Sequence, residues 1–327
     1  MRYTDDGNAQ MDEPRSPDAS PPRVSVVIPS YRSGRTLGDV LAALHRELSE
    51  MSHEIVVLDS AARGDAAAAA RPYPTVRVVE RAERLSCGDA RNAGAAAARG
   101  DRILFLDADC VPQPGWGRAL ARLLDEPPAA VSGPMANGTP RSWAGSLQYW
   151  VEFSRFVPSS RPGHRQFLPS FQLLIPREFL TSLPPYAPEF IVAEDILFSG
   201  RITRAGLPVR FEPELVVTHR NKERLRDVLR HLFQLGYGSG RARRLYPGLR
   251  KATVRFVPFL APAVLAYTWA GLAWRMITAW PNPGWRAPVL LALAVPGLAC
   301  WHAGFWVGLN FPRKTQWPYR RLMGIPR

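Results

Sequence analysis

Two acidic residues, separated by one position, end an apolar run of strand length. In the stretch Arg102-Ile-Leu-Phe-Leu-Asp-Ala-Asp-Cys110, side chains of an extended chain alternate, so Asp107 and Asp109 face the same side. Two carboxylates aimed at one point are suitable ligands for a divalent cation that bridges phosphates. The same spacing also suits an Asx turn that closes a buried strand. The pair alone does not choose between a metal site and a turn.

Predicted strands and helices alternate along the chain on either side of this acidic pair, and they would set its position. β-branched runs of strand length alternate with helical sequence, and Gly100 ends one helix because it tolerates the left-handed conformation. The predicted strands lie near residues 24–28, 54–59, 75–80 and 102–106, and the predicted helices near 36–48 and 89–99. Such alternation predicts an α/β fold with a mostly parallel sheet that helices cover on both faces.

Polar or turn-forming residues follow three of these strands. Pro29 and Tyr31 follow the first, Asp59 ends the second, and Asp107 and Asp109 follow the fourth. Ligands of open α/β sheets bind outside the carboxyl ends of the strands, so these residues should gather at one edge. Convergent polar groups of this kind predict a phosphate or metal site there.

A second acidic pair begins a predicted helix at residues 193–206. Glu194 and Asp195 stand in its first turn, and Gly206 ends it. The two carboxylates could complement the helix dipole or serve as chemical groups. Further strands are predicted near residues 129–134 and 171–175, and a pair of short strands at 209–212 and 215–218 leads to His219.

Residues 141–170 mix aromatic residues with arginines and show no regular period. Aromatic residues in such a segment can be buried or exposed, and the pattern does not distinguish the two. We interpret the segment as an irregular subdomain that covers the sheet, with an acceptor-binding surface as the alternative.

Composition bounds the classes of protein to which this chain can belong. Its 327 residues suit one large α/β domain with additions, and a hydrophobic content of 46% excludes a wholly disordered chain. A net charge of +14 favours an anionic partner. Three widely spaced cysteines exclude a disulfide framework and a zinc cluster. Residues 1–22 contain no apolar run, so they predict a disordered tail and not a secretory signal.

The C-terminal third of the chain is first basic and then apolar. Residues 220–255 carry many arginines with leucines at helical spacing, which predicts a basic amphipathic helix beside a membrane. Residues 256–274 and 287–311 contain no charged side chain and are long enough to cross a bilayer. Residues 256–311 therefore predict a transmembrane hairpin, with a pair of buried helices in a soluble core as the alternative.

The charges that flank the apolar segments predict their orientation. Arginines and lysines lie before residue 256 and in the tail at 312–327, whereas the connection carries only Arg275 and Arg286. The positive-inside rule therefore places both ends, and the α/β domain at 23–219, on the cytoplasmic side of the inner membrane. Anionic membrane lipid accounts for the basic cluster, so we expect no nucleic-acid partner.

Four motifs in one order resemble the family 2 glycosyltransferases of the GT-A fold. Residues 24–31 (Val-Ser-Val-Val-Ile-Pro-Ser-Tyr) resemble the opening strand of that family, and residues 87–94 (Cys-Gly-Asp-Ala-Arg-Asn-Ala-Gly) resemble its Ala-Arg-Asn-x-Gly segment. Asp107-Ala-Asp109 resembles the metal-binding Asp-x-Asp, and Glu194-Asp195 resembles the Glu-Asp motif of the catalytic base. The resemblance covers approximately residues 23–245 and implies a GT-A fold with a Rossmann-like mixed sheet.

The resemblance and the chemistry of sugar transfer together imply roles for the candidate residues. Asp195 would be the catalytic base, supported by Glu194, and Asp109 would bind Mg²⁺ or Mn²⁺. The residues implied in nucleotide-sugar binding are Pro29, Tyr31, Asp59, Arg91 and Asp107, and those that would assist Asp109 in metal binding are Asp107 and His219. His219 could instead be hydrogen-bonded locally at the end of its strand.

The chain departs from the family pattern at two places. After Asp59 it continues with Ser60-Ala-Ala-Arg63, where the family usually has acidic and small residues, so the contact with the nucleotide base is less secure. The Gln-x-x-Arg-Trp signature of processive polysaccharide synthases is missing after His219, where residues 234–238 read Gln-Leu-Gly-Tyr-Gly. This second departure favours transfer of a single sugar over polymer synthesis.

These inferences predict an inverting, metal-dependent enzyme that moves one sugar from a nucleotide-diphosphate sugar to a hydroxyl acceptor. The membrane hairpin favours a lipid-linked acceptor or a cell-envelope glycan. A polyprenyl-phosphate glycosyltransferase is the alternative among enzymes, because a lipid phosphate ionises without strong help from a base. A membrane adaptor that kept the fold without activity is the alternative outside enzymes, although Asp107, Asp109 and Asp195 are intact.

Overall fold

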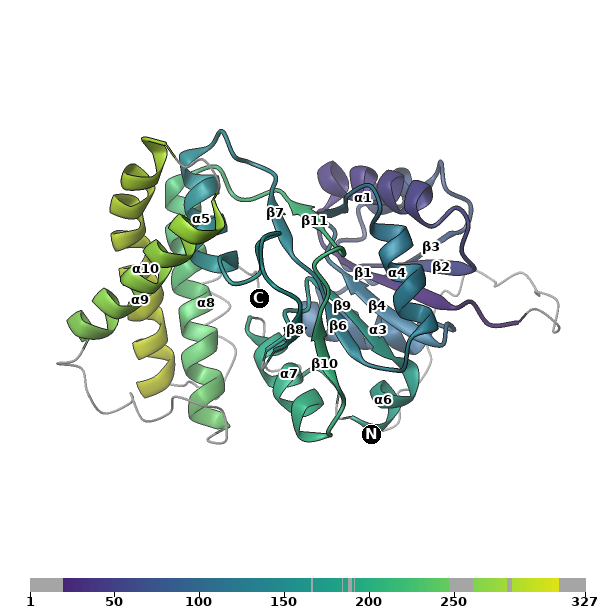
Figure 1. The fold of residues 1–327 in the computed structure, drawn as a ribbon. Helices are drawn as coiled ribbons and strands as arrows, with labels where there is room; N and C mark the ends of the chain where they lie inside the picture. Colours follow the sequence, from purple (N-terminus) through teal and green to yellow (C-terminus); the bar gives the residue numbers. More distant parts are fainter. Residues whose placement is uncertain are drawn as a thin grey trace.

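A computed structural model describes residues 20–165, 167–183, 185–187, 190, 192–246, 261–280 and 284–311. Most of the tail predicted at residues 1–22, and all of the basic tail predicted at 312–327, lie outside these residues. The chain builds an α/β part and, beside it, a group of helices (Figure 1).

The α/β part is built on a mixed sheet of eight strands in the described residues, as predicted for a GT-A fold. β1, β2, β3 and β4 pair in parallel, and β9 then runs antiparallel between β4 and β6. The spatial order is β3 (Val76–Glu80), β2 (His53–Asp59), β1 (Val24–Ser30), β4 (Arg102–Leu106), β9 (Gln172–Pro176), β6 (Ala130–Ser132), β10 (Val209–Phe211) and β8 (Gly163–His164). The parallel half brings the carboxyl ends of β1, β2 and β4 to one edge.

Helices cover both faces of this sheet. One face carries α1 (Gly34–Glu47), α2 (Asp65–Ala70) and α4 (Trp116–Asp125), and the other carries α3 (Cys87–Ala97), α6 (Arg177–Ser182) and α7 (Glu194–Arg204) (Figure 1). Gly94 lets α3 lie close to β1, because a Cβ atom there would be 2.4 Å from a methyl of Val27. The ring of Tyr186 stacks on that of Phe198 of α7, at 4.0 Å between centroids. These contacts fix the positions of α3, which contains Arg91, and of α7, which begins with Glu194 and Asp195.

A second, three-stranded sheet stands at the exit of β4. It consists of β5 (Cys110–Pro112), β11 (Val217–His219) and β7 (Met135–Asn137), with β11 in the centre. The predicted pairing of strands 209–212 and 215–218 is wrong, because β10 belongs to the large sheet and β11 to the small one. β10 pairs in parallel with β6, and β11 pairs in parallel with β7, so β10 and β11 do not pair with each other as a hairpin.

The segment 141–170, interpreted above as irregular, contains a helix. α5 (Trp143–Phe153) begins at Ser142, whose hydroxyl accepts a hydrogen bond of 3.1 Å from the backbone N–H of Gly145. Most of its residues are buried, including Leu147, Trp150 and Phe153. A helix that is buried nearly all round has no polar face, which is why no helical period was visible in the sequence.

The remaining helices form a helical layer, which we define as α8 (Leu225–Leu245), α9 (Ala261–Ala279) and α10 (Arg286–Asn310). α8 and α10 touch along their backbones: a Cβ atom on Gly236 would lie 1.9 Å from the carbonyl oxygen of Trp301, and one on Gly304 would lie 2.0 Å from that of Phe233. Residues 225–245 of the basic segment therefore form a helix, one face of which is buried against α10, and residues 247–255 lie outside the described part.

One helix among the described residues is long and apolar enough to cross a membrane. This helix is α10, with a mean hydropathy of 1.6 over its most apolar window. The segment predicted at 256–274 contributes to α9, which starts at residue 261 and includes the charged Arg275; residues 256–260 lie outside the described part. The predicted two-span hairpin is thus not confirmed as such.

Candidate active site

Asp107 and Asp109 lie in the turn that joins β4 to β5. The backbone N–H of Asp107 donates to the carbonyl of Phe171 at 2.9 Å, and that of Cys110 donates to the carbonyl of Asp107 at 3.0 Å. The backbone thus forms a tight turn, while the Asp107 and Asp109 side chains are both part of a cavity wall. The sequence left a turn and a metal site as alternatives for these two residues, and the structure is compatible with both at once.

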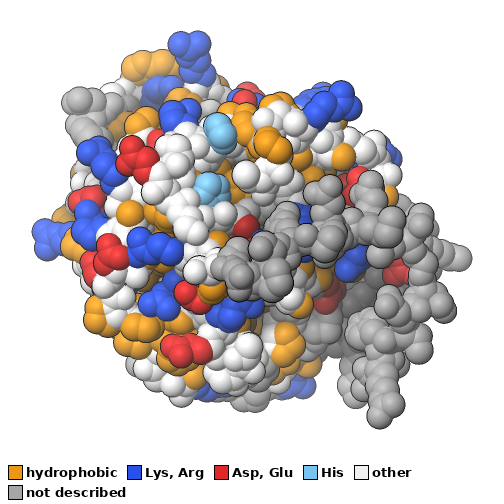
Figure 2. All heavy atoms as spheres, turned by 90° about the vertical axis from the view of Figure 1, so that its right-hand side faces the viewer, with side chains coloured by type: hydrophobic (Ala, Val, Ile, Leu, Met, Phe, Trp, Pro, Cys, Tyr) orange, Lys and Arg blue, Asp and Glu red, His pale blue; other side chains and the backbone are white. Residues whose placement is uncertain are grey.

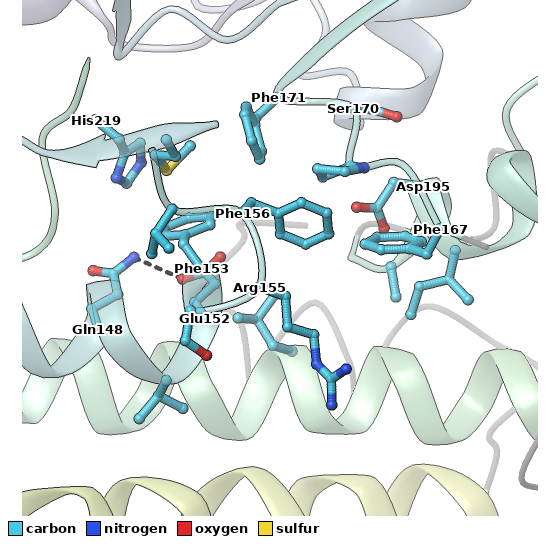
Figure 3. Close-up of a pocket in the computed structure, with 18 of the residues that line it drawn as sticks. Gln148, Glu152, Phe153, Arg155, Phe156, Phe167, Ser170, Phe171, Asp195 and His219 are labelled. Atoms are coloured by element: carbon cyan, nitrogen blue, oxygen red, sulfur yellow. Dashed lines mark hydrogen bonds between the residues drawn. The ribbon is translucent and has the colours of Figure 1, made fainter. Parts of the chain in front are cut away.

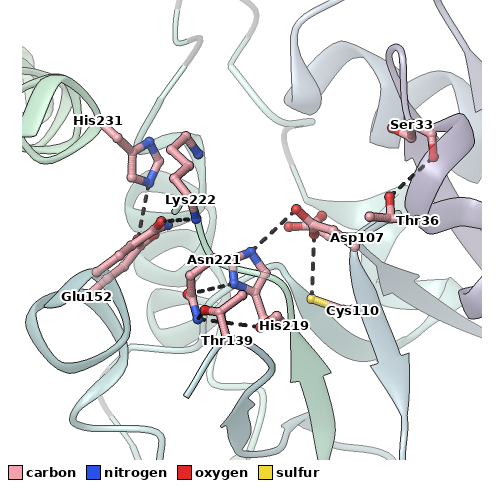
Figure 4. A network of polar contacts seen from close by, with 12 residues as sticks. Ser33, Thr36, Asp107, Cys110, Thr139, Glu152, His219, Asn221, Lys222 and His231 are labelled. Atoms are coloured by element: carbon pink, nitrogen blue, oxygen red, sulfur yellow. Dashed lines mark hydrogen bonds and ion pairs between the residues drawn. The ribbon is translucent and has the colours of Figure 1, made fainter. Parts of the chain in front are cut away.

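The small sheet brings His219 to Asp109. β11 pairs with β5 so that His219 stands opposite Cys110, and its Nε2 atom lies 3.4 Å from Oδ2 of Asp109. The other ring nitrogen, Nδ1, lies 2.9 Å from Oδ1 of Asn221, whose amide donates to Asn137 (Figure 4). Two residues that are 110 positions apart are therefore joined by sheet register, and the imidazole is held in a fixed orientation.

The charges of this pair support each other. Burial alone would lower the pKa of His219, but Asp109 and Glu152 outweigh it and raise that pKa to about 9. Burial alone would raise the pKa of Asp109, but His219 lowers it below its ordinary value. The pair is therefore an imidazolium and a carboxylate at neutral pH in the protein alone.

The donor set fits a divalent cation only in part. No group of three His, Cys, Asp or Glu side chains has ligand geometry within the described ranges. Asp109 and His219 nevertheless offer an oxygen and a nitrogen 3.4 Å apart at the cavity wall. A metal held by this pair would need its remaining ligands from a substrate such as a diphosphate or from water.

Arg91 joins the two acidic pairs. Its guanidinium is 3% exposed and donates from Nη2 to Oδ1 of Asp107 and from Nη1 to Oε1 of Glu194, both at 2.7 Å. The resemblance implied nucleotide-sugar binding for Arg91, whereas in this structure both terminal nitrogens of its guanidinium bind carboxylates. The sequence contained no sign of this bridge, since its partners are 16 and 103 residues away.

Asp195 is the carboxylate of the second pair that remains for chemistry. It stands in the first turn of α7, two residues after Ala193, which adopts the left-handed conformation with φ of 69°. Burial raises the pKa of Asp195, and Glu194 raises it further, to about 7. Figure 3 shows its side chain beside Phe167 in the cavity, with the rings of Phe156 and Phe171 between it and His219 in this view.

The predicted nucleotide residues gather at the ends of β1 and β2. Pro29 is the partner of Leu58, and the hydroxyl of Ser30 donates to Oδ1 of Asp59 at 3.0 Å. Oδ2 of Asp59 is buried without a hydrogen-bond partner in the described part of the chain. The guanidinium of Arg84 covers the ring of Tyr31 at 4.1 Å. Asp59 thus has an unused acceptor atom at the edge where a nucleotide was expected.

One cavity of about 1540 Å³ connects the two acidic pairs with the helical layer. Asp109, Asp195 and His219 line one end, and Trp274 of α9 and Trp301 of α10 line the other. Between these ends the cavity is lined by Glu152, Arg155, His231 and Arg275. None was a predicted site residue, although Arg155 belongs to the segment 141–170, for which an acceptor-binding surface was the alternative. Glu152 pairs with His231 at 3.1 Å, a contact between α5 and α8 (Figure 4). Helix α5 was not predicted from the sequence, so the part of the cavity wall that it forms was not predicted either.

Figure 2 shows one face of the α/β part, on which lysine and arginine side chains are spread among acidic and apolar ones over the described residues. The charge of this face is therefore mixed, in contrast to the uninterrupted basic surface that nucleic-acid binding favours.

Comparison with known proteins agrees with this architecture. Residues 25–180 match the family model Glycosyl transferase family 2. The mannosyltransferase PcManGT from Pyrobaculum calidifontis, solved in complex with GDP-Man and Mn²⁺, superposes with a TM-score of 0.58 at 20% identity. The superposition covers 90% of this chain and 89% of PcManGT, so the two share a fold over nearly their whole lengths.

Two relatives are similar in sequence. Glycosyltransferase AglE of Haloferax volcanii is 22% identical over 66% of this chain and 73% of its own length. The pre-mycofactocin glycosyltransferase of Mycobacterium tuberculosis is 24% identical over 88% of this chain, which spans only 59% of that relative. The family model, these relatives and the geometry of the two acidic pairs lead to one assignment. Residues 25–180 of the chain are a family 2 glycosyltransferase domain, and the fold is that of the GT-A enzymes.

Proposed function

We propose that this enzyme moves one sugar from a nucleotide-diphosphate sugar to a hydroxyl acceptor, with metal dependence and inversion at the anomeric carbon. The observation that carries the proposal is the shared cavity of Asp109, His219 and Asp195. One end of this arrangement suits a diphosphate leaving group, and Asp195 suits an acceptor that must lose a proton. A base with a pKa near neutral is well matched to that task.

Asp195 would act as the general base. It would take the proton of the acceptor hydroxyl as the acceptor oxygen bonds to the anomeric carbon of the sugar. The bond between that carbon and the diphosphate oxygen breaks in the same step, and the nucleoside diphosphate leaves with the electron pair. Because the attack comes from the side opposite the leaving group, the configuration at the carbon inverts.

Asp109 and His219 would hold Mg²⁺ or Mn²⁺. When bound, the cation supplies positive charge that offsets the negative charge developing on the diphosphate. His219 must give up its ring proton to serve as a ligand, since the protein alone holds it as an imidazolium. Asn221 keeps the imidazole oriented through its hydrogen bond to Nδ1.

Arg91 and Glu194 would support the reacting carboxylates. Arg91 holds Glu194 on one side and Asp107 on the other, so the turn after β4 and the start of α7 keep a fixed separation. Asp107 would remain near the ribose and the metal, as the resemblance implies. Pro29, Tyr31 and Asp59 would bind the nucleoside, with the unused Oδ2 atom of Asp59 accepting its hydrogen bond.

We further propose that the helical layer attaches the enzyme to the inner membrane, with the α/β part in the cytoplasm. Three large aromatic side chains of the layer are exposed, namely Tyr267, Trp274 and Trp285 at 78%, 68% and 72%. Aromatic side chains of this kind are typical of the interface between membrane and water. The acceptor would then be lipid-linked or a cell-envelope glycan, and anionic lipid would attract the basic residues of 220–255.

A panel of sugar nucleotides tests the proposal directly. Thermal unfolding of the full chain should shift upward with one donor, and only in the presence of Mn²⁺, because a ligand that binds the folded state alone stabilises it. The stabilising donor should then transfer its radiolabelled sugar to a membrane lipid extract. If no donor stabilises the protein and none is hydrolysed or transferred, the fold serves as a non-catalytic membrane adaptor.

A further inference from the structure

Helix α8 lies between α10 and the chain that leads into α7 (Figure 1). A Cβ atom on Gly236 would lie 1.9 Å from the carbonyl oxygen of Trp301, and one on Gly240 would lie 2.1 Å from that of Phe305, so both glycines face α10. Successive residues of an α-helix are turned by about 100°, so Gly238, which stands midway between them, faces the opposite side. Backbone therefore approaches α8 closely on two sides at one level of the helix.

Gly238 contacts the two residues that precede α7. A Cβ atom on Gly238 would lie 2.6 Å from the carbonyl oxygen of Val192 and 3.2 Å from the Cβ atom of Ala193. α7 begins immediately after this contact, with Glu194 and Asp195 in its first turn. A side chain at position 238 would therefore have to push α8 and the start of α7 apart.

Ala193 has an unusual backbone conformation at this contact. Its φ of 69° and ψ of 20° are left-handed, whereas the residue before a helix is ordinarily extended. The left-handed conformation costs an alanine free energy, because its Cβ atom comes close to the following carbonyl oxygen. A residue keeps such a conformation where its surroundings impose it. The packing around Ala193 must therefore supply the constraint.

Two helices hold the described residues that lead to this contact. On α3, the side-chain amide of Asn92 donates to the backbone carbonyl of Tyr186 and accepts from its backbone N–H, each at 2.9 Å. On α8, the guanidinium of Arg241 covers the ring of Phe190 at 4.6 Å. The chain ahead of α7 is thus fixed to both helices and has little freedom to turn.

These restraints decide where the Asp195 side chain points. Because the chain ahead of Ala193 is held, a change in the φ or ψ of Ala193 would turn the first residues of α7 instead. Glu194 is tied to Arg91 at 2.7 Å, whereas Asp195 forms no ion pair in the described part of the chain. The direction of Asp195 therefore depends on the backbone turn at Ala193 more than on a partner of its own.

We propose that Gly238 is a positioning residue for Asp195. Because residue 238 has no side chain, α8 closes on the carbonyl group of Val192 and keeps Ala193 left-handed, and this turn aims the Asp195 carboxylate into the cavity. The inference rests on the proposed function, since Asp195 is the base assigned there. It gives the helical layer a part in catalysis in addition to attachment.

Gly238→Ala in the full chain tests this inference. It should reduce kcat about 100-fold, the loss expected when a reacting group is misplaced by about 1 Å. Mn²⁺-dependent binding of the donor that stabilises the protein should be unchanged, because the donor site lies at the ends of β1, β2 and β4. The pH at which kcat/KM rises should move away from about 7, because burial and Glu194 act on Asp195 according to where its side chain lies. An unchanged kcat with an unchanged pH profile would overturn the inference.

Two other glycines supply matched controls. Gly117 of α4 lies on the other face of the sheet, and a Cβ atom there would be 1.8 Å from the carbonyl oxygen of Glu47. Gly117→Ala should therefore lower the unfolding temperature, as Gly238→Ala does, and leave the pH profile of the folded enzyme unchanged. Gly38→Ala, with nothing within 4 Å of the added atom, should match the unaltered chain in both measurements. A pH profile that moves equally in Gly117→Ala would reduce the effect to a general loss of stability.

Substitutions of Ala193 test the same turn from its other side, even where Gly238→Ala does not fold. Valine is strongly disfavoured in the left-handed conformation, whereas glycine adopts it freely. Ala193→Val should therefore reduce kcat about 100-fold, as expected for a displaced base, and Ala193→Gly should reduce it less than about tenfold. Equal losses in the two variants would show that the left-handed turn is not what positions Asp195.

Hydrogen exchange gives a readout that does not depend on catalysis. In Gly238→Ala, the backbone N–H groups of residues 194–198 should exchange about tenfold faster than in the unaltered chain, because the start of α7 has lost its packing. If exchange is faster while Asp195→Asn keeps full activity, the base assignment of the proposed function fails and the contact of Gly238 with the start of α7 stands. If exchange and kcat are both unchanged in Gly238→Ala while Asp195→Asn is inactive, the proposed function stands and only the role of Gly238 fails.

Discussion

The two acidic pairs of this enzyme lie on different elements, yet each is divided in the same way. In the turn after β4, Asp107 is bound by Arg91 while Asp109 faces His219. At the start of α7, Glu194 is bound by the same Arg91 while Asp195 is left at the cavity with a pKa raised to about 7. In each pair, one carboxylate is thus bound by an arginine and the other is not. A single buried arginine makes the division in both.

Removal of Arg91 should have the largest effect, because it disturbs both pairs at once. Arg91→Met would leave the buried Glu194 and the partly buried Asp107 without this partner, and breaking a buried pair costs about 3–5 kcal/mol of unfolding free energy. Denaturant unfolding measures this loss. The exposed pairs of Arg122 provide the control, since Arg122→Ala should cost about 0–1 kcal/mol. Equal losses in the two variants would refute the central role of Arg91.

Asp195→Asn should reduce kcat by about 10²–10⁴-fold, the usual contribution of a general base, without weakening donor binding. Transfer of a radiolabelled sugar measures the rate, and calorimetry with the nucleotide measures binding. Glu194→Gln should reduce kcat less, because Glu194 acts through Arg91 and does not take the proton. Full activity of Asp195→Asn would remove the base assignment and favour a polyprenyl phosphate as the nucleophile.

Asp109→Ala should weaken Mn²⁺-dependent nucleotide binding about 100-fold, since a metal–ligand contact to a diphosphate contributes several kcal/mol. Calorimetry with and without Mn²⁺ separates the metal-dependent part of the affinity. Asp125→Ala removes a carboxylate of the exposed pair with Arg23 and should leave this affinity unchanged. Metal-dependent affinity that survives in Asp109→Ala would show that the cation binds elsewhere.

The pH dependence of kcat/KM should be the smallest of these effects. The pKa of Asp195 is raised to about 7, so the carboxyl is protonated and inactive below that pH and ionised above it. The rate should therefore rise about tenfold from pH 6 to pH 8 and then level off. Asp195→Asn should lose this inflection while keeping its residual activity. A flat profile for the unaltered enzyme would speak against a base with this pKa.

The sequence was sufficient for the elements whose pattern is local. The strands that became β1, β2 and β4 were predicted because they are short apolar runs. Pro29 does not end the first of them, since β1 continues through Pro29 to Ser30. Asp59 ends β2 and Asp107 follows β4, as expected, and their roles in binding stay predictions. The description of the GT-A fold is likewise confirmed by the family model and by the superposition on PcManGT.

What the sequence did not disclose depends on long-range contacts. The bridge of Arg91 to Glu194 joins residues 103 positions apart, and the contact of His219 with Asp109 depends on the register of β11 and β5. Helix α5 was missed because burial on nearly all sides removes its amphipathic pattern. In the sequence, residues 234–238 were noted only because the Gln-x-x-Arg-Trp signature is missing there. Gly236, which lies among them, allows α8 to approach α10 closely.

The close contact of α8 with two neighbours limits which acceptors can react. On one side α8 touches the backbone of α10, and on the other a Cβ atom at Gly238 would lie 2.6 Å from the carbonyl oxygen of Val192, three residues before Asp195. Asp195, the proposed base, is thus held at a fixed height above the apolar helices. An acceptor with a longer spacer between its hydrocarbon chain and its nucleophilic oxygen would carry that oxygen past the base. Head-group length, and not only head-group identity, would then decide which lipids are glycosylated.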